Sequence, residues 1–253
     1  MLTIVCPYQV IDPVRCTLPR FVDVVDGAPG VYSTMAALTW EESALIVVMW
    51  CEEPAWRGLP NRSGSLDWER DYVEIFIAGD ECYCGVTLGR DGALDQTLYV
   101  WKDAYDTNPR FRASEFDLVT CDALIFDGDP NRSRRNAFSR EGEHPRGYRW
   151  AFRNWRVTGI TTSIEFEPAE RHNTRRWVVR VALPWTALQW MRGDDYRVRA
   201  GDIWRVHVGR YTPLAMSGAV VHSFTAAAAF GSADRHFPER FLAVELQGAP
   251  SNG

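Results

Sequence analysis

The chain has 253 residues, of which 46% are hydrophobic and 24% charged, a composition typical of a folded protein with a sizeable core. Its formal net charge of −5 argues against a nucleic acid or an anionic membrane as the main partner. The first residues show no export signal and no apolar run is long enough to cross a membrane. We therefore expect a cytoplasmic protein, or an extracytoplasmic one if a leader has been removed.

The first third of the chain predicts short strands separated by turns. A Pro-rich entry arm, residues 1–30, is expected to hold one or two short strands. Ala36–Trp40 and the apolar run Ala44–Cys51 are separated by a polar turn and predict a hairpin. A polar loop that contains Trp56 follows, and loops beside a rigid sheet often carry binding residues.

The strand at Tyr72–Ile77 alternates between two faces. Val73, Ile75 and Ile77 are expected to point into a core, with Glu74 on the other face and Trp68 at the strand's entrance. An indole beside a carboxylate suits a sugar, because the ring covers an apolar sugar face while the carboxylate accepts from hydroxyls. A core tryptophan beside a solvated glutamate is the alternative that the same spacing allows.

The rest of the chain continues the same pattern around one interruption. Residues 102–149 are rich in Asp, Asn, Pro and Arg and predict a long loop insertion with one strand, Phe116–Phe126, inside it. Pro184 is expected to end a strand and begin a short helix. Further strands are expected at 82–88, 95–101, 161–166, 176–183, 203–211 and 220–224, and residues 236–246 are expected to close the fold. The sequence thus predicts an all-β protein, an antiparallel β-sandwich formed by a single domain over residues 1–250.

Metal and catalytic patterns are weak. Cys82 and Cys84 project to one face of a strand, but no His or second Cys pair stands at ligand spacing, so we expect reduced thiols and no zinc site. Asp71 and Glu74 point in opposite directions and are not expected to flank a cleft as a glycosidase pair does. His207 is predicted to lie on a polar surface, which is commoner than a catalytic base.

Four segments, in order, resemble a known family. They are the strand pair at 36–51, the stretch Trp-x-x-Asp-x-Val-Glu-Ile-Phe-Ile at 68–77, Trp177–Leu188 with its Pro-Trp, and Gly201–Tyr211. The chain then closes on His236-x-Pro-Glu-Arg-Phe. This ordered set resembles the family 9 carbohydrate-binding modules and their stand-alone bacterial relatives. The resemblance covers roughly residues 34–246, apart from the insertion.

The resemblance implies a jelly-roll-like sandwich that binds sugars without cutting them and often holds structural calcium. Trp68 and Glu74 match one of the family's two clamping tryptophans and its glutamate. The family's arginine falls near Val86 and its second tryptophan near residues 235–237, so two of the four ligand contacts have changed. The candidate replacements are Trp56, Trp101 and Phe237.

The same resemblance does not decide whether this chain has a structural calcium site. Glu53 stands where the family favours Asp, and six or more oxygen ligands cannot be assembled from the sequence. We expect no other cofactor. Carbohydrate binding is the first functional hypothesis, followed by a structural or protein-interaction domain that has lost sugar binding, and then by a carbohydrate-active enzyme.

Overall fold

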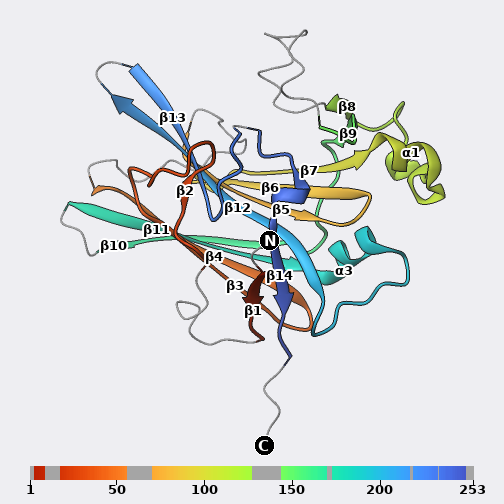
Figure 1. Cartoon of the computed structure of the whole chain (residues 1–253), viewed down its shortest axis with the longest axis horizontal. Coiled ribbons are helices and arrows are strands. Elements are labelled where there is room, and N and C mark those ends of the chain that lie inside the picture. The colour runs from red at the N-terminus through yellow and green to blue at the C-terminus, as the bar shows by residue number, and fades with distance from the viewer. Residues whose placement is uncertain are drawn as a thin grey trace, which may run out of the picture.

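Two β-sheets pack face to face in the computed structural model, which describes residues 3–8, 18–55, 70–126, 144–169, 173–216, 219–232 and 234–248 (Figure 1). Among these residues the larger sheet has the strand order β1-β14-β12-β5-β6-β7-β9-β8, with β13 beside β12 and β2 beside β13. Its strands are β1 (Thr3–Cys6), β2 (Val22–Asp23), β5 (Tyr72–Ala78), β6 (Cys82–Gly89), β7 (Leu94–Trp101), β8 (Ala123–Phe126), β9 (Arg149–Phe152), β12 (Ile203–Met216), β13 (Ala219–Ala226) and β14 (Leu242–Leu246).

The smaller sheet has the order β10-β11-β4-β3, with β3 (Thr34–Trp40), β4 (Ala44–Pro54), β10 (Thr161–Pro168) and β11 (Thr174–Pro184). All of its pairings are antiparallel, whereas β1 and β14 in the larger sheet run parallel. The predicted β-sandwich is therefore confirmed, and the apolar run at 44–51 is a central strand of the smaller sheet.

The alternation of β5 places one of its faces in the core between the sheets. Val73, Ile75 and Ile77 are almost completely buried and belong to the main core cluster, as predicted. β5 lies between β12 and β6, and both neighbours supply aliphatic side chains to the same cluster. Cys82 and Cys84 also point into this core, where burial raises the pKa of both thiols.

The outer face of β5 is covered as well, which the sequence analysis did not anticipate. Every residue of β5 is buried, including Glu74 at 2% exposure. Rings from the chain after β13 lie over this face: Phe230 and Phe241 contact His207, and His236 contacts Phe76. A solvated Glu74 is therefore excluded, and any chemistry at this carboxylate takes place beneath a covering layer.

Much of the predicted insertion is folded. Helix α1 (Lys102–Thr107) is followed by short 3-10 helices at Pro109–Arg112 and Ser114–Phe116, and then by β8. The predicted strand over Phe116–Phe126 is wrong in its first part, because Phe116 ends a 3-10 helix and β8 begins only at Ala123. Residues 127–143 lie outside the described part of the chain.

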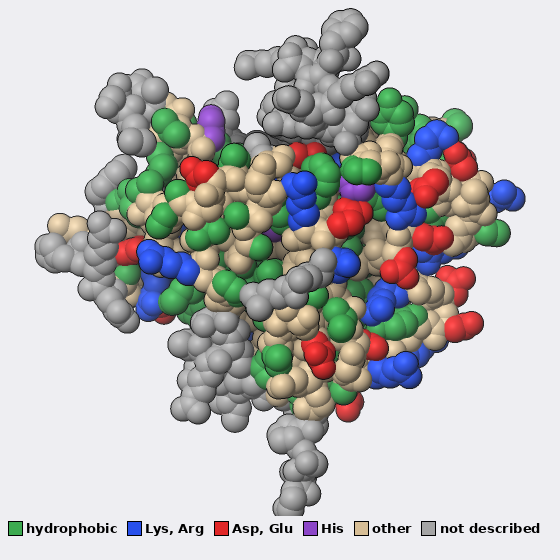
Figure 2. Space-filling view, viewed as in Figure 1, with side chains coloured by type: hydrophobic (Ala, Val, Ile, Leu, Met, Phe, Trp, Pro, Cys, Tyr) green, Lys and Arg blue, Asp and Glu red, His purple; other side chains and the backbone are tan. Residues whose placement is uncertain are grey.

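The other short helices lie where proline begins them. The helix expected after Pro184 is α3 (Trp185–Leu188), continued by a 3-10 helix at Gln189–Arg192, and a last 3-10 helix spans Pro238–Arg240. None of the described helices is long and apolar enough to cross a membrane. Figure 2 shows acidic and basic side chains side by side on the visible face, most densely over α1 and α3.

A buried ion pair joins the two sheets at the entrance of β5. Arg210 of β12 donates to both oxygens of Asp71, at 3.2 and 3.1 Å, and both side chains are at most 1% exposed. The same guanidinium donates to Thr34 Oγ1 on β3 and to the Glu52 carbonyl on β4. One arginine therefore fixes the position of β5, and so of Glu74, against the smaller sheet.

We expect Arg210→Met to lower the free energy of unfolding by about 3–5 kcal/mol, because it leaves the Asp71 carboxylate buried without its cation. Urea denaturation monitored by tryptophan fluorescence measures this loss. The matched control is Arg180→Met on the exposed side of β11, for which we expect a change within about 0.5 kcal/mol. Equal stability of the two variants would contradict the structural role of Arg210.

Candidate functional site

The candidate site is centred on the Glu74 carboxylate, on the outer face of the larger sheet. Glu74 Oε1 lies 2.6 Å from Nε of Arg235 and 3.0 Å from Nε2 of His207. His207 comes from β12, the strand beside β5, and Arg235 comes from the covering chain between β13 and β14. The site thus joins the sheet to the segment that covers it.

Opposing effects set the charge of this carboxylate. Burial raises the pKa of Glu74, but the Arg235 guanidinium and the His207 hydrogen bond lower it by more, so the pKa lies below its usual value. In the same way, burial disfavours the charged form of Arg235, and the neighbouring Glu74 more than restores it, so the pKa of Arg235 is raised. The site at neutral pH therefore holds an ion pair.

Two glycines make room for this arrangement. A Cβ at Gly209, directly opposite Glu74 on β12, would lie 2.7 Å from His207 Nε2 and 3.0 Å from Glu74 Oε1. A Cβ at Gly85 of β6 would lie 2.4 Å from the Phe76 ring. The side chains of His207 and Phe76 therefore occupy space that a Cβ at Gly209 or Gly85 would fill.

An aromatic cluster lies beside Glu74 on the same face. Its members are Phe76, Tyr83, Tyr99, Trp101, Phe126, His144, His236 and Phe237. His236 contacts Tyr83, Tyr99 and Phe126 through ring centroids 4.5–5.9 Å apart. Its Nδ1 lies 3.1 Å from the Tyr83 hydroxyl. Burial lowers the pKa of His236 well below its usual value, and the charges of Arg149 and Arg235 lower it further, so this imidazole is neutral at pH 7.

The structure places the sequence-predicted ligand residues as follows. Trp101 is 2% exposed, with His144 at 4.4 Å and the Arg149 guanidinium at 4.8 Å from its ring, so it has no open face for stacking. Phe237 is half-buried against His144 and Arg240. Trp56 and Trp68 lie outside the described residues, so their predicted roles stay predictions.

Two partners of Glu74 were not identified as such in the sequence. Arg235 lies where the resemblance predicts the family's second tryptophan, and its side chain pairs with Glu74 as a cation. His207 was expected on a polar surface, but it is 3% exposed and bonded to Glu74. The alternation of Val206 and Val208 puts His207 on the Glu74 face, yet only the β5–β12 register brings the two together.

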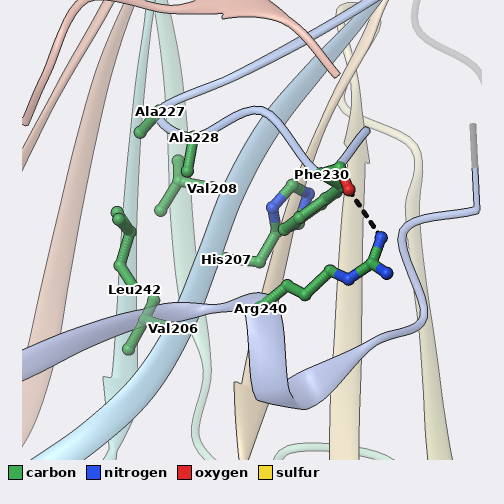
Figure 3. Close-up of a pocket in the computed structure, with 8 residues that line it drawn as sticks. All are labelled: Val206, His207, Val208, Ala227, Ala228, Phe230, Arg240 and Leu242. Atoms are coloured by element: carbon green, nitrogen blue, oxygen red, sulfur yellow. Dashed lines mark hydrogen bonds between the residues drawn. The ribbon is translucent and has the colours of Figure 1, made fainter. Parts of the chain in front are cut away.

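A small crevice lies behind the site. Its lining residues are Val206, His207, Val208, Ala227, Ala228, Phe230, Arg240 and Leu242, and Arg240 donates across it to the Phe230 carbonyl (Figure 3). The gap between these side chains leaves no room even for a water molecule, so this crevice is not itself a sugar pocket.

Calcium does not fit the residues around Glu53. Arg90 donates to both carboxylate oxygens at 2.5 and 2.6 Å, and Arg175 donates to Oε1 at 2.6 Å. Two guanidinium groups thus already neutralise this fully buried carboxylate. In the described part of the chain, no group of three His, Cys, Asp or Glu side chains is arranged to hold a metal.

We expect a calcium chelator to leave the thermal unfolding temperature unchanged, because the Glu53 carboxylate is held by Arg90 and Arg175. Differential scanning fluorimetry with EDTA, and with added calcium after dialysis, measures this. A melting temperature that rises with calcium concentration would contradict it, since an ion that binds only the folded state stabilises by mass action.

We expect stability to fall as the pH drops below about 6.5, because unfolding lets His236 take up a proton that the folded protein excludes. The group binds more protons in the unfolded state, so its contribution is fully present above that pH. Urea midpoints measured from pH 7.5 to 5 test this, and His236→Gln should flatten the profile. His222→Gln, at an exposed imidazole on β13, should keep the native profile.

Comparison with known proteins relates this fold to solved structures. No protein-family model matches the chain, and a search of curated proteins gives no significant match. A family 9 carbohydrate-binding module from Caldicellulosiruptor kristjanssonii, solved with cellotriose, is 13% identical with a TM-score of 0.50, covering 100% of this chain and 97% of that one. A "putative carbohydrate-binding protein" from Bacteroides uniformis is 12% identical with a TM-score of 0.53, covering 97% and 98%. The chain therefore has the β-sandwich fold of the family 9 carbohydrate-binding modules.

Proposed function

We propose that this protein binds carbohydrate without cleaving it, on the outer face of the larger sheet around Glu74. The observation that carries the proposal is a charged cluster at the centre of an aromatic face, in a fold that similar modules use to hold cellotriose. Paired hydroxyls of a sugar are good partners for a guanidinium–carboxylate pair, because the pair offers donors and acceptors together.

Within this proposal, Arg235 and Glu74 have different tasks. The Arg235 side chain is 17% exposed, whereas that of Glu74 is 3% exposed, so the guanidinium is the more accessible group. Glu74 holds it in place, and the His207 hydrogen bond holds Glu74. The Trp68 indole, predicted at the entrance of β5, supplies the stacking face.

A structural or interaction domain is the second candidate. The observation that favours it is that Glu74 and Trp101 are already engaged by protein partners, which is expected where sugar contacts have been lost. An enzyme is the third candidate and has less support. Asp71 is bound to Arg210 on the core side of the sheet while Glu74 lies on the outer side, so the two carboxylates do not face a common cleft.

We expect the native chain to bind one class of sugar weakly, with Kd in the roughly millimolar to high-micromolar range, because a single indole and one charge cluster contact the ring. Isothermal titration calorimetry against a broad panel of mono- and oligosaccharides measures this. Glu74→Gln should weaken binding about tenfold or more by releasing Arg235, and Trp68→Ala should remove it while the fold stays intact.

The matched control is Glu167→Gln, which removes a half-exposed carboxylate that pairs with Arg176 on the smaller sheet. It should bind sugar as the native chain does. If no member of the panel gives heat with the native chain, the carbohydrate proposal fails and the interaction domain takes its place.

A further inference from the structure

Arg149 is a buried charge without a hydrogen-bonding partner. Its side chain is 0% exposed, and none of its three guanidinium nitrogens has a hydrogen-bond acceptor. This differs from two other buried arginines: Arg210 is bound to Asp71, and Arg90 is bound to Glu53. A guanidinium has five N–H donors, so leaving all of them unused in a protein interior is unfavourable.

The strand register builds an aromatic cage around this charge. Arg149 on β9 lies directly opposite Trp101 on β7 and Phe126 on β8, so the three side chains share one face of the sheet. Its guanidinium carbon lies 4.8 Å from the Trp101 ring, 5.3 Å from Phe126 and 5.8 Å from Tyr83. Rings thus surround the guanidinium, while its hydrogen-bonding edges stay unused.

The cage belongs to the same face as the Glu74 site. Tyr83 reaches His236 by a hydrogen bond, His236 contacts Phe76, and Phe76 follows Glu74 by two residues on β5. A sugar ring at Glu74 and Arg235 would therefore have aromatic surface on the side toward Arg149.

We propose that the ligand of this face is an acidic sugar whose ring carboxylate is bound by Arg149; this inference rests on the proposed carbohydrate binding. A carboxylate matches the planar fork of a guanidinium with two parallel hydrogen bonds. A single carboxylate charge also balances the single unpaired cation. The carboxylates of Asp234 and Glu239 lie near enough to help raise the pKa of the neighbouring Tyr83. A doubly charged phosphate would be repelled by these carboxylates more strongly than a singly charged carboxylate would. Because the guanidinium is fully buried, side chains must move aside for the ligand, and association is expected to be slow.

The experiment compares acidic and neutral forms of the same sugars on the full chain. Calorimetry measures binding of glucuronate and galacturonate, of glucose and galactose, and of glucose 6-phosphate. We expect the native chain to bind one acid at least tenfold more tightly than its neutral form. Arg149→Met, which keeps the volume and removes the charge, should abolish that preference and leave neutral-sugar binding intact. Arg149→Lys should restore it only in part.

Arg146→Met is the matched control, because Arg146 also lies over the Trp101 ring, at 5.2 Å, but is paired with Asp103. It should keep the preference for the acid. Thermal unfolding checks the fold, and Arg149→Met should unfold at the native temperature or above, since it removes an unpaired buried charge. A large loss of stability without a change in sugar preference would show that Arg149 only holds the aromatic rings together, and would overturn the proposal.

The remaining outcomes separate this inference from carbohydrate binding itself. If glucose binds and neither acid binds better, the Arg149 site fails and the carbohydrate proposal stands. If no sugar binds but cyclohexanecarboxylate, which has the carboxylate without hydroxyls, binds in an Arg149-dependent way, carbohydrate binding fails and the anion site stands. If glucose 6-phosphate binds more tightly than the acids, the carboxylate assignment is overturned.

Discussion

Burial of the Glu74 carboxylate is the constraint on which the outer face of the larger sheet depends. A strand with both faces covered cannot leave a charge to water, so each polar group there needs a protein partner. Glu74 obtains one partner from β12 and one from the covering chain. The side chain of His207 then occupies the space over residue 209, which is why glycine stands there. The Glu74 carboxylate thus requires Arg235 from the covering chain, the β5–β12 register that places His207 beside it, and a glycine at position 209.

Arginine performs this pairing throughout the chain. Lys102 is the only lysine, and every other basic residue is an arginine, which a compositional bias alone would explain. The structure gives the bias a physical consequence, because a planar guanidinium can satisfy two carboxylate oxygens at once in a buried position. Arg90 and Arg210 do so for Glu53 and Asp71. At Glu53 the guanidinium groups of Arg90 and Arg175 together supply the positive charge that neutralises the buried carboxylate.

Most of the sandwich was predictable because its signals are local. The alternation at Tyr72–Ile77 and the apolar run Ala44–Cys51 identify strands whatever their neighbours are, and Pro184 ends a strand by its own chemistry. The folded part of the insertion was missed because its short helices depend on tertiary contacts, such as Phe111 against Phe116.

The candidate site was predictable only in part, because its partners come from distant segments. Glu74 could be assigned to the outer face from its strand alone. Its pairing with His207, 133 positions away, depends on the β5–β12 register, and the position of Arg235 depends on the path of the closing chain. Neither leaves a periodic signal in the sequence. For the same reason, the lack of a hydrogen-bond acceptor at Arg149 can be recognised only from the folded structure, in which all of its neighbours are placed.

The charges on the outer face bear directly on the proposed ligand. Arg235 offers this face a charged group that recognises polar partners, whereas an aromatic ring would recognise an apolar surface. Yet Arg235 is neutralised by Glu74, just as Arg146 is by Asp103. The Arg149 guanidinium differs from both, because none of its nitrogens has a hydrogen-bond acceptor in the structure. A buried guanidinium without an acceptor favours a ligand that brings one, and a carboxylate presents two oxygens in the matching geometry. A neutral sugar would offer Arg149 only hydroxyl oxygens, whereas an acidic one would also offer the opposite charge.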